Sequence, residues 1–277
     1  YLFLISANIL YRLRLRTNQW KKPWLPNPNL RTDPFLISSS SLLCRRRHFP
    51  SSTDSSSLRT LTPRRFPQGA PWVHYHGTFK DLNINLIWTG NDPTLGVDSI
   101  GTIPSALATY AAILALQPDL IINAGTAGGF KAKGASIGDI FVVSECAFHD
   151  RRIPIPIFDL YGVGLRKAFE TPKLVKELNL KVAKLSTGDS LDMTQQDGSL
   201  IIANDATVID MEGAAIAYVA DLLKVPAIFI KAVTNNVDDD KAIVEEFLQN
   251  LAALTVELGL AVEQVINFIN GKCISEL

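Results

Sequence analysis

The sequence predicts an α/β fold in which a mostly parallel central sheet carries helices on both faces. From Trp72 onward, short apolar runs alternate with longer segments of helical periodicity. The apolar runs are continuous, which is typical of parallel strands that are buried on both faces. Polar or glycine-rich segments follow several of these runs directly, and ligands of such sheets bind beyond the carboxyl ends of the strands.

The first predicted elements lie between residues 84 and 148. A short apolar run predicts a strand at Ile84–Trp88, and apolar residues at helical spacing predict a helix at Gly101–Leu116. A second strand, Leu120–Asn123, enters a glycine-rich turn that ends at Gly129. A third strand is predicted at Ile140–Phe148, followed by a loop that two prolines interrupt.

The remaining elements continue the alternation of helix and strand. They are a helix at Leu165–Leu178, a strand at Val182–Ser186, a strand at Val208–Met211, a helix at Gly213–Leu223, a strand at Ala227–Val233 and a long amphipathic helix at Val244–Ile269. Gly271 follows the last helix, as glycine often does at a helix end.

Residues 1–66 differ in composition from residues 67–277, and we expect two regions with a boundary there. The first region carries 12 Lys and Arg but only two acids, together with runs of serine. This composition is typical of organelle transit segments, although a disordered segment remains an alternative. We expect a cytoplasmic protein, or one of a plastid or mitochondrion if residues 1–66 are a transit segment.

Charge and cysteine usage exclude several classes of function. Residues 67–277 hold 15 bases and 25 acids, and an acidic surface does not suit nucleic acid. Cys44, Cys146 and Cys273 have neither the number nor the spacing of a disulfide framework or a zinc site. The most apolar region, Ile216–Val233, contains charged residues and a proline, so we expect no membrane span.

Two segments at strand ends are candidates for ligand binding. Glycines in Gly125–Gly129 let backbone amides approach a ligand, and Thr126 adds a hydroxyl, but a plain tight turn is equally open. The segment Asp210-Met211-Glu212 closes a strand and opens a helix. A carboxylate there can accept hydrogen bonds from a sugar diol, whereas a purely structural acid in a first helical turn is the alternative.

Other polar segments favour simpler interpretations. The small and acidic residues of Ser186–Asp192 favour a turn. The acids of Thr234–Asp240 favour a solvated loop, because they lack the spacing of a calcium-binding EF-hand. His149–Arg152 leaves surface and interface roles open. His74 and His76 alternate along one strand without a partner cluster, so we expect no metal site.

Taken together, these segments resemble the plant-type 5′-methylthioadenosine nucleosidases of the purine nucleoside phosphorylase superfamily. The similar segments, which occur in the same order, are Trp72–Gly77, Gly96–Ala106, Pro118–Gly138, Phe148–Gly164, Leu185–Met193, Asn204–Pro226 and Lys231–Asn250. The resemblance implies a three-layer fold and hydrolysis of the adenine–ribose bond of 5′-methylthioadenosine in methionine salvage, with S-adenosylhomocysteine as a further candidate substrate. It also implies a homodimer, an adenine nucleoside as the ligand, and no metal or cofactor.

The resemblance assigns roles to particular residues. Glu212, with Met211, matches the pair that binds the ribose hydroxyls. Thr126, beside Gly125 in the glycine-rich segment, matches a hydroxyl residue near the attacking water and the sugar. Leu191 matches a position whose backbone contacts the adenine edge. The loop from His149 to Tyr161 matches one that contributes to a dimer interface and to the neighbouring pocket.

Two departures from the family pattern concern catalysis. The family protonates the leaving adenine with an Asp, but the matching residue is Asn235. An amide transfers no proton, and loss of a general acid costs about 10²–10⁴ in rate. Asp238 matches another family position. The family also begins with a strand that ends in a water-activating Glu. No equivalent precedes Trp72, so we expect this first strand to be missing or replaced.

Three functional hypotheses follow. The first is a nucleosidase that acts on methylthioadenosine. The second is a catalytically impaired relative that binds adenine nucleosides or assembles with an active subunit. The third is a nucleoside phosphorylase, which is the least favoured because no Arg adjoins the glycine-rich segment.

Overall fold

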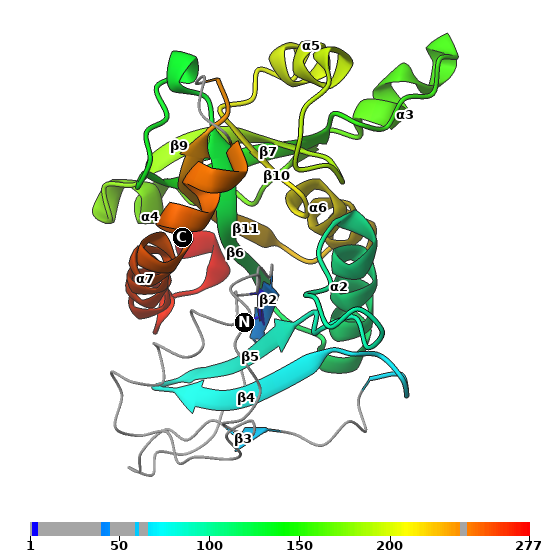
Figure 1. Ribbon diagram of the computed structural model, residues 1–277. Helices are drawn as coiled ribbons and strands as arrows, with labels where there is room; N and C mark the ends of the chain where they lie inside the picture. Colours follow the sequence, from blue (N-terminus) through cyan, green and yellow to red (C-terminus); the bar gives the residue numbers. More distant parts are fainter. Residues whose placement is uncertain (1, 5–39, 45–58, 61–65, 239–242) are drawn as a thin grey trace.

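The computed structural model describes residues 2–4, 40–44, 59–60, 66–238 and 243–277. Within these residues the predicted α/β class is confirmed: one sheet runs through the molecule, and helices cover both of its faces (Figure 1). Most of residues 1–66, and therefore their predicted transit-like or disordered character, lie outside the described residues.

The described strands form a single sheet. They are β1 (Leu2–Leu4), β2 (Ser40–Cys44), β3 (Arg59–Thr60), β4 (Val73–Phe79), β5 (Leu82–Trp88), β6 (Leu120–Gly129), β7 (Ile140–Phe148), β8 (Arg166–Lys167), β9 (Lys181–Thr187), β10 (Val208–Asp210) and β11 (Ala227–Asn236). The helices are α2 (Thr102–Leu116), α3 (Asp159–Val163), α4 (Pro172–Glu177), α5 (Gln195–Ala203), α6 (Gly213–Leu222) and α7 (Ile243–Ile269), with short 3₁₀ turns at Lys131–Lys133, Pro156–Phe158 and Ile274–Glu276.

The sheet mixes parallel and antiparallel pairs, and part of it curls shut. In the order β6, β11, β7, β9 and β10, each strand pairs with the next, and β10 returns to pair with β6. The closing contact is antiparallel and joins Val208 to Gly129 and Ile209 to Gly128. In this closed, barrel-like part of the sheet, β6 and β11 run antiparallel to β7, β9 and β10. Closure places the end of β10 beside the second half of β6.

A short strand occupies a place beside β6. The strand β1 pairs in parallel with both β5 and β6, and β2 pairs antiparallel with β1 and β6. The strand β1 has only three residues, and the expectation that the family's first strand is missing or replaced stays a prediction. The residues of β1, Leu2, Phe3 and Leu4, include no acid.

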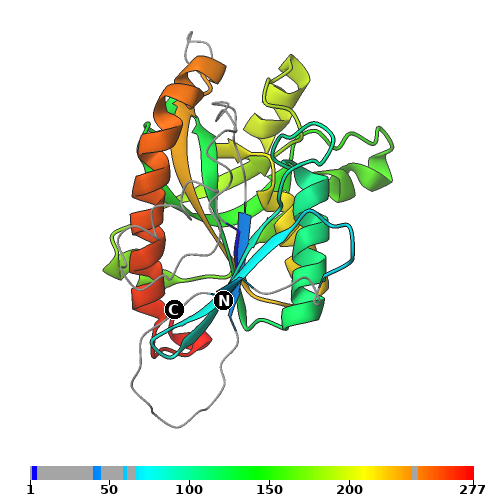
Figure 2. The same ribbon diagram turned by 60° about the horizontal axis from the view of Figure 1, so that its bottom comes forward.

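The helices cover both faces of the sheet, as the continuous apolar runs of the strands predict. α7 lies against one face, while α2 and α6 lie side by side against the other (Figures 1 and 2). α7 is long and apolar enough to cross a membrane, but one side of it packs on β11 and contributes Leu258, Val262 and Val265 to the core. It is thus a core helix of the α/β domain.

Two predicted elements need correction. The glycine-rich segment Gly125–Gly129 is the second half of β6 instead of a turn, and it pairs with β11 as far as Gly129. The predicted helix Leu165–Leu178 is wrong over its first half, because Arg166–Lys167 pairs with β7 and Pro172 starts a helix of only six residues. Proline favours the first turn of a helix and opposes one that continues through it.

Two helices, α3 and α5, were not expected, and the start of α5 shows a clear signal. Thr194 caps α5 with its hydroxyl, and the Asp197 carboxylate reaches back to the Thr194 amide. This reciprocal pair is a capping box. The same spacing of Thr194 and Asp197 in the sequence would have predicted the start of the helix.

Candidate functional site

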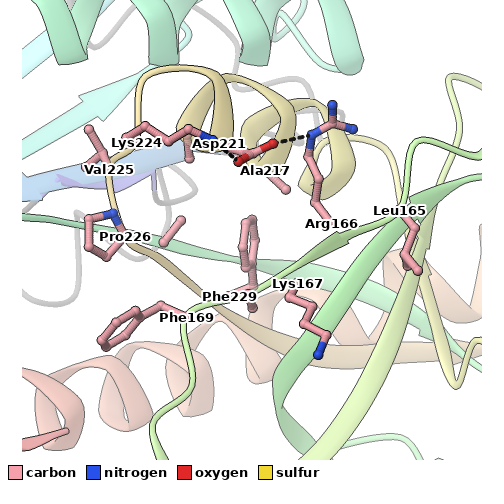
Figure 3. A pocket seen from close by; sticks show the side chains of 13 residues that line it. Leu165, Arg166, Lys167, Phe169, Ala217, Asp221, Lys224, Val225, Pro226 and Phe229 are labelled. Carbon is pink, nitrogen blue, oxygen red and sulfur yellow. Dashed lines mark hydrogen bonds and ion pairs between the residues drawn. The ribbon is translucent and has the colours of Figure 1, made fainter. Parts of the chain in front are cut away.

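The described residues form two notable cavities at opposite ends of β11. The larger, of about 500 Å³, lies at the amino end of β11 near Pro226 and is lined by β8 and α6 (Figure 3). There, Asp221 forms ion pairs with both Arg166 and Lys224. Because ligands of α/β sheets bind at the carboxyl ends of the strands, this cavity is not the candidate site.

The smaller cavity, of about 130 Å³, lies at the carboxyl end of β11 and is the candidate site. Its lining comes from the ends of β6, β7, β9, β10 and β11 and from the start of α7. The lining residues are Ile100, Thr126, Ala127, Gly128, His149, Ser190, Leu191, Ile209, Asp210, Met211, Glu212, Thr234, Asn235, Val237, Ile243 and Phe247.

Most of the residues predicted for the site lie together. Thr126, Leu191, Met211, Glu212 and Asn235 come from four separate segments of the chain, and all of them line this cavity. Gly125 is the exception. It is buried in β6 just beneath the cavity, where a Cβ atom would lie 3.1 Å from Nζ of Lys231.

Glu212 occupies the junction between β10 and α6. It is the N-cap residue of α6, and its side chain is buried, so the carboxylate lies inside the cavity wall. Its Oε1 accepts a hydrogen bond of 3.2 Å from the backbone N–H of Gly101, at the start of α2. A buried carboxylate beside the apolar Met211 provides acceptors for hydroxyl groups of a bound sugar.

An ion pair lies directly beneath this junction. Nζ of Lys231 is 2.7 Å from Oδ2 of Asp210, and neither side chain is exposed by more than 1%. The same carboxylate accepts hydrogen bonds from the hydroxyl of Thr187 at 2.6 Å and from the N–H of Gly213 at 2.8 Å. Charges buried this deeply require partners, and here each has one.

Gly213 shows how closely this junction is packed. A Cβ atom on Gly213 would approach Cδ2 of Leu185 to 2.3 Å and Oδ2 of Asp210 to 3.0 Å. Glycine lets the first turn of α6 pass close to β9. The position of Glu212 is therefore fixed by packing as well as by the ion pair.

Asn235 contributes an amide to the cavity. Its side chain is 4% exposed, and Oδ1 lies 3.0 Å from the hydroxyl of Thr234. That hydroxyl is also 3.2 Å from the carbonyl of Ala127, and its single proton serves one of the two acceptors. Whichever way the amide is oriented, it has no titratable proton to give to a leaving group.

Asp238 is already engaged elsewhere and does not replace the missing acid. Its two carboxylate oxygens each accept a hydrogen bond of 2.8 Å, from the N–H groups of Lys131 and Ala132. Burial alone would raise the pKa of Asp238, but these backbone hydrogen bonds hold it below its usual value. The residue is therefore a fixed carboxylate that supports the 3₁₀ turn.

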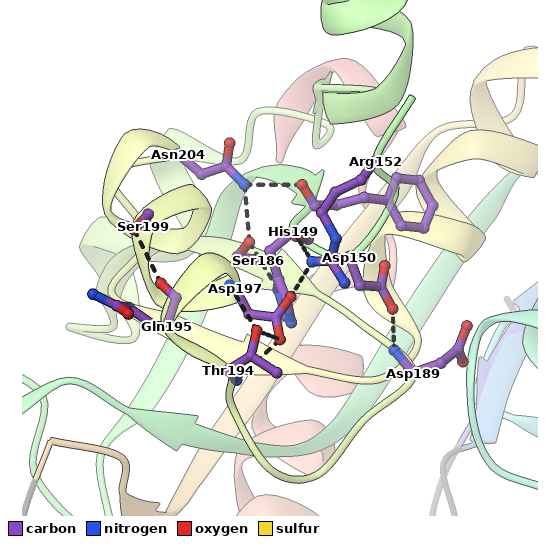
Figure 4. A network of polar contacts seen from close by, with 11 residues as sticks. His149, Asp150, Arg152, Ser186, Asp189, Thr194, Gln195, Asp197, Ser199 and Asn204 are labelled. Atoms are coloured by element: carbon purple, nitrogen blue, oxygen red, sulfur yellow. Dashed lines mark hydrogen bonds and ion pairs between the residues drawn. The ribbon is translucent and has the colours of Figure 1, made fainter. Parts of the chain in front are cut away.

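A polar network extends from the cavity into the loop that follows β7 (Figure 4). Nδ1 of the buried His149 lies 3.1 Å from the hydroxyl of Ser186, which also accepts a hydrogen bond from Asn204. Arg152 pairs with the buried Asp197 of α5. The network anchors the first residues of the His149–Tyr161 loop beside the cavity.

His149 is held in its neutral form. Burial is the largest influence and lowers the pKa of the imidazole, against the raising effect of Asp150, Asp197 and Asp210. The ring also lies over Gly188, whose Cβ position would be only 2.3 Å from Nε2. A glycine is needed there because the imidazole fills the space of a side chain.

Two features of the site were not predicted from the sequence. Lys231 lies in the middle of an apolar strand, and a lone charge in such a run would have indicated a buried partner. Ile100 and Phe247, whose apolar side chains did not mark them as site residues in the sequence, complete the cavity wall.

His74 and His76 both contact Oδ1 of Asn85, and among the described residues no group of metal-binding side chains is found.

The fold and the site define a class: an α/β protein with a small cavity at the carboxyl end of β11. Apolar side chains line the cavity together with polar groups that include the buried carboxylates of Asp210 and Glu212. Residues 54–267 match the Phosphorylase superfamily. A 5′-methylthioadenosine nucleosidase of Arabidopsis thaliana is 66% identical over 79% of this chain and 82% of its own length. The chain belongs to the Phosphorylase superfamily and, within it, to the plant-type 5′-methylthioadenosine nucleosidases.

Further relatives agree with this membership. A 5′-methylthioadenosine/S-adenosylhomocysteine nucleosidase of Arabidopsis thaliana is 63% identical over 76% of this chain and 84% of its own length. The apo structure of Arabidopsis thaliana 5′-methylthioadenosine nucleosidase superposes with a TM-score of 0.78 at 64% identity, covering 79% of this chain and 90% of the other. A Helicobacter pylori nucleosidase structure, at 20% identity and a TM-score of 0.60, shares the fold.

The buried ion pair leads to a prediction about stability. Replacing Lys231 by Met leaves the Asp210 charge buried without a partner, and we expect the free energy of unfolding to fall by about 3–5 kcal/mol. Urea denaturation measures this. Lys224→Met, which breaks the exposed pair with Asp221, is the control and should cost at most about 1 kcal/mol. Equal losses in the two variants would contradict the role of the buried pair.

The lowered pKa of His149 leads to a prediction about pH. The unfolded chain takes up a proton near the usual pKa of 6.5, while the folded chain resists it until lower pH. Stability is therefore lost as the pH falls through 6.5 toward the lower pKa of the folded state. In urea titrations from neutral to acidic pH, His149→Gln should lose stability less steeply than the unsubstituted chain. Parallel curves would show that His149 is not protonated differently on folding.

Proposed function

We propose that this protein hydrolyses the bond between adenine and the sugar of 5′-methylthioadenosine. One observation carries the proposal: the buried carboxylate of Glu212 shares a cavity with Thr126, Leu191, Met211 and Asn235, the positions to which family membership assigns ribose and adenine. Relatives that are 66% and 63% identical are nucleosidases of this compound.

Each residue has a proposed part in binding. Glu212 accepts hydrogen bonds from the ribose hydroxyls, and Met211 packs against the sugar. The backbone at Leu191 meets the adenine edge, and the hydroxyl of Thr126 lies near the sugar. Asn235 lies at the position from which the family protonates the leaving base. With its Nδ2 turned toward the base, it donates a hydrogen bond to a ring nitrogen.

The replacement of the family's Asp by Asn235 affects turnover more than binding. Departure of adenine requires a proton at the base, and an amide supplies a hydrogen bond without transferring its proton. Asp210 is ion-paired with Lys231, and both carboxylate oxygens of Asp238 already accept hydrogen bonds from backbone N–H groups, so neither side chain is placed to serve as the acid. We therefore propose that hydrolysis by this chain is slow and that residue 235 limits it.

Hydrolysis is favoured over phosphorolysis by the character of the cavity. Its described lining contains no Lys or Arg, and the nearby Lys231 is occupied by Asp210. A phosphate dianion would find no basic side chain there. Adenine release should consequently be independent of phosphate.

Restoring the acid tests the proposal. We expect Asn235→Asp to release adenine from 5′-methylthioadenosine faster than the unsubstituted chain, by up to about 10²–10⁴. Asn270→Asp adds the same charge beyond the end of α7, away from the cavity, and should leave the rate unchanged. Release is followed by absorbance with and without phosphate.

The outcomes separate the possible defects. Failure of the unsubstituted chain and of Asn235→Asp to bind or cleave 5′-methylthioadenosine would overturn the proposed function. Binding without any gain from Asn235→Asp would contradict the limiting role of Asn235 and point to activation of the attacking water. The same assay with S-adenosylhomocysteine shows whether a longer 5′ substituent is accepted.

We also propose that the protein is a homodimer that associates through the His149–Tyr161 loop. The part of this loop around α3 extends away from the sheet as an arm (Figure 1). Its apolar side chains are largely exposed, with Ile157 at 83% and Leu160 at 86%. A second exposed apolar row, formed by Ile103 and Leu107, runs along α2. Apolar surface of this extent is typical of a protein interface.

Charged substitutions on the arm test the dimer. We expect Ile157→Glu combined with Leu160→Glu to convert a dimer into a monomer, because two charges would be buried at the interface. Sedimentation velocity measures the change. Ile202→Glu, at a residue of α5 that is 72% exposed, is the control and should leave the dimer intact. Dimers that survive the arm substitutions would place the interface elsewhere.

A further inference from the structure

The amino-terminal end of α2 lacks a cap of its own. Its N-cap residue is Gly101, with φ of 98°, and no side chain within the first turn accepts a hydrogen bond from the free N–H groups. The first turn also carries no acid. A helix start of this kind needs acceptors from elsewhere in the structure.

Two carboxylates supply these acceptors: Glu212, which lines the cavity, and Asp189, which directly precedes the lining residue Ser190. Oε1 of Glu212 accepts from the N–H of Gly101 at 3.2 Å, and Oδ1 of Asp189 accepts from the N–H of Thr102 at 2.6 Å. Oδ2 of Asp189 also accepts from the hydroxyl of Thr102. Thus Gly101 and Thr102, at the start of α2, donate to two different acids. Glu212 comes from the β10–α6 junction, and Asp189 comes from the loop after β9.

The loop after β9 is held from its other side as well. The N–H of Asp189 donates to Oδ2 of Asp150 at 2.6 Å (Figure 4). Asp189 is followed immediately by Ser190 and Leu191, which line the cavity. Leu191 is 43% exposed, so packing alone does not fix its backbone.

Gly101 provides an independent indication that this contact is close. A Cβ atom at this position would lie 2.6 Å from Oδ1 of Asp189, and the positive φ would strain any other residue. The start of α2 therefore fits against Asp189 only with glycine at position 101.

We propose that Asp189 is a positioning residue that fixes the adenine-binding wall of the cavity relative to the ribose-binding wall. Through Thr102 it anchors the backbone before Leu191 to the same helix end that holds Glu212. The two walls are thereby set at the separation that a nucleoside requires. The inference rests on the proposed function, because it takes Leu191 as the adenine contact and Glu212 as the ribose contact.

Binding of separate substrate fragments tests the proposal. Calorimetry with adenine, with 5-methylthioribose and with 5′-methylthioadenosine is carried out on the full chain and on Asp189→Ala. We expect the affinity for adenine and for the nucleoside to fall about tenfold, as for the loss of one or two hydrogen bonds. The affinity for 5-methylthioribose should stay within about twofold, because the Glu212 contact remains.

A conservative variant and a control complete the experiment. Asp189→Asn can still accept from the N–H of Thr102 and should recover most of the adenine affinity. Asp192→Ala removes an acid from the same loop without a recorded contact to α2, and it should bind all three ligands normally. Amide hydrogen exchange at Thr102 should be faster in Asp189→Ala than in the unsubstituted chain.

Each result decides between the proposals. Adenine affinity that is unchanged in Asp189→Ala, or that falls together with 5-methylthioribose affinity, would overturn the positioning role and leave the proposed function intact. Failure of the unsubstituted chain to bind any of the three ligands would overturn the proposed function, and the positioning role with it.

Discussion

The ion pair between Lys231 and Asp210 is the constraint on which the site depends. Removing two charges from water costs several kcal/mol for each ion, and this cost is offset only when the geometry is held closely. Here the Asp210 carboxylate is shared among Lys231 of β11, Thr187 of β9 and the first turn of α6. Three elements must therefore keep their relative positions or leave a buried charge unsatisfied. Glu212, two residues after Asp210, takes its place in the cavity as a consequence.

Closure of the sheet turns this local constraint into a site. A flat sheet with the same mixture of parallel and antiparallel pairs would separate the end of β10 from the second half of β6. The pairing of Val208 and Ile209 with Gly129 and Gly128 brings these segments together. Both glycines are closely packed: a Cβ atom on Gly128 would lie 3.3 Å from Cγ1 of Ile209 in β10, and one on Gly129 would lie 2.7 Å from Cγ1 of Val233 in β11. The glycines that suggested a turn in the sequence instead lie within a strand and allow neighbouring side chains to pack closely.

The sequence predicted the fold class and part of the cavity lining, for identifiable reasons. Continuous apolar runs located β6, β7, β9 and β11, and the polar segment after the run at β10 made Glu212 a candidate for ligand binding. Asn235 entered through the family resemblance alone, because the residues around it favoured a solvated acidic loop. The sequence-based prediction was wrong at Arg166–Lys167, where apolar residues at helical spacing suggested a helix. These residues instead pair with β7, and a local sequence pattern does not contain such a long-range contact. The sequence-based prediction also missed the partner of Lys231, since Asp210 lies 21 residues away and meets it only after the barrel closes.

Under the proposed function, binding and proton transfer depend on different parts of the structure. The elements that shape the cavity are the ion pair, the packing of Gly213 on β9, and the hydrogen bonds from α2 to Glu212 and Asp189. None of these contacts involves Asn235. An amide in place of a carboxyl group at this position changes neither the volume of the side chain nor its contact with Thr234 to any great extent. Under the proposed function, the chain therefore keeps the geometry that recognises an adenine nucleoside, whereas the rate of cleavage depends on a proton that residue 235 itself cannot provide.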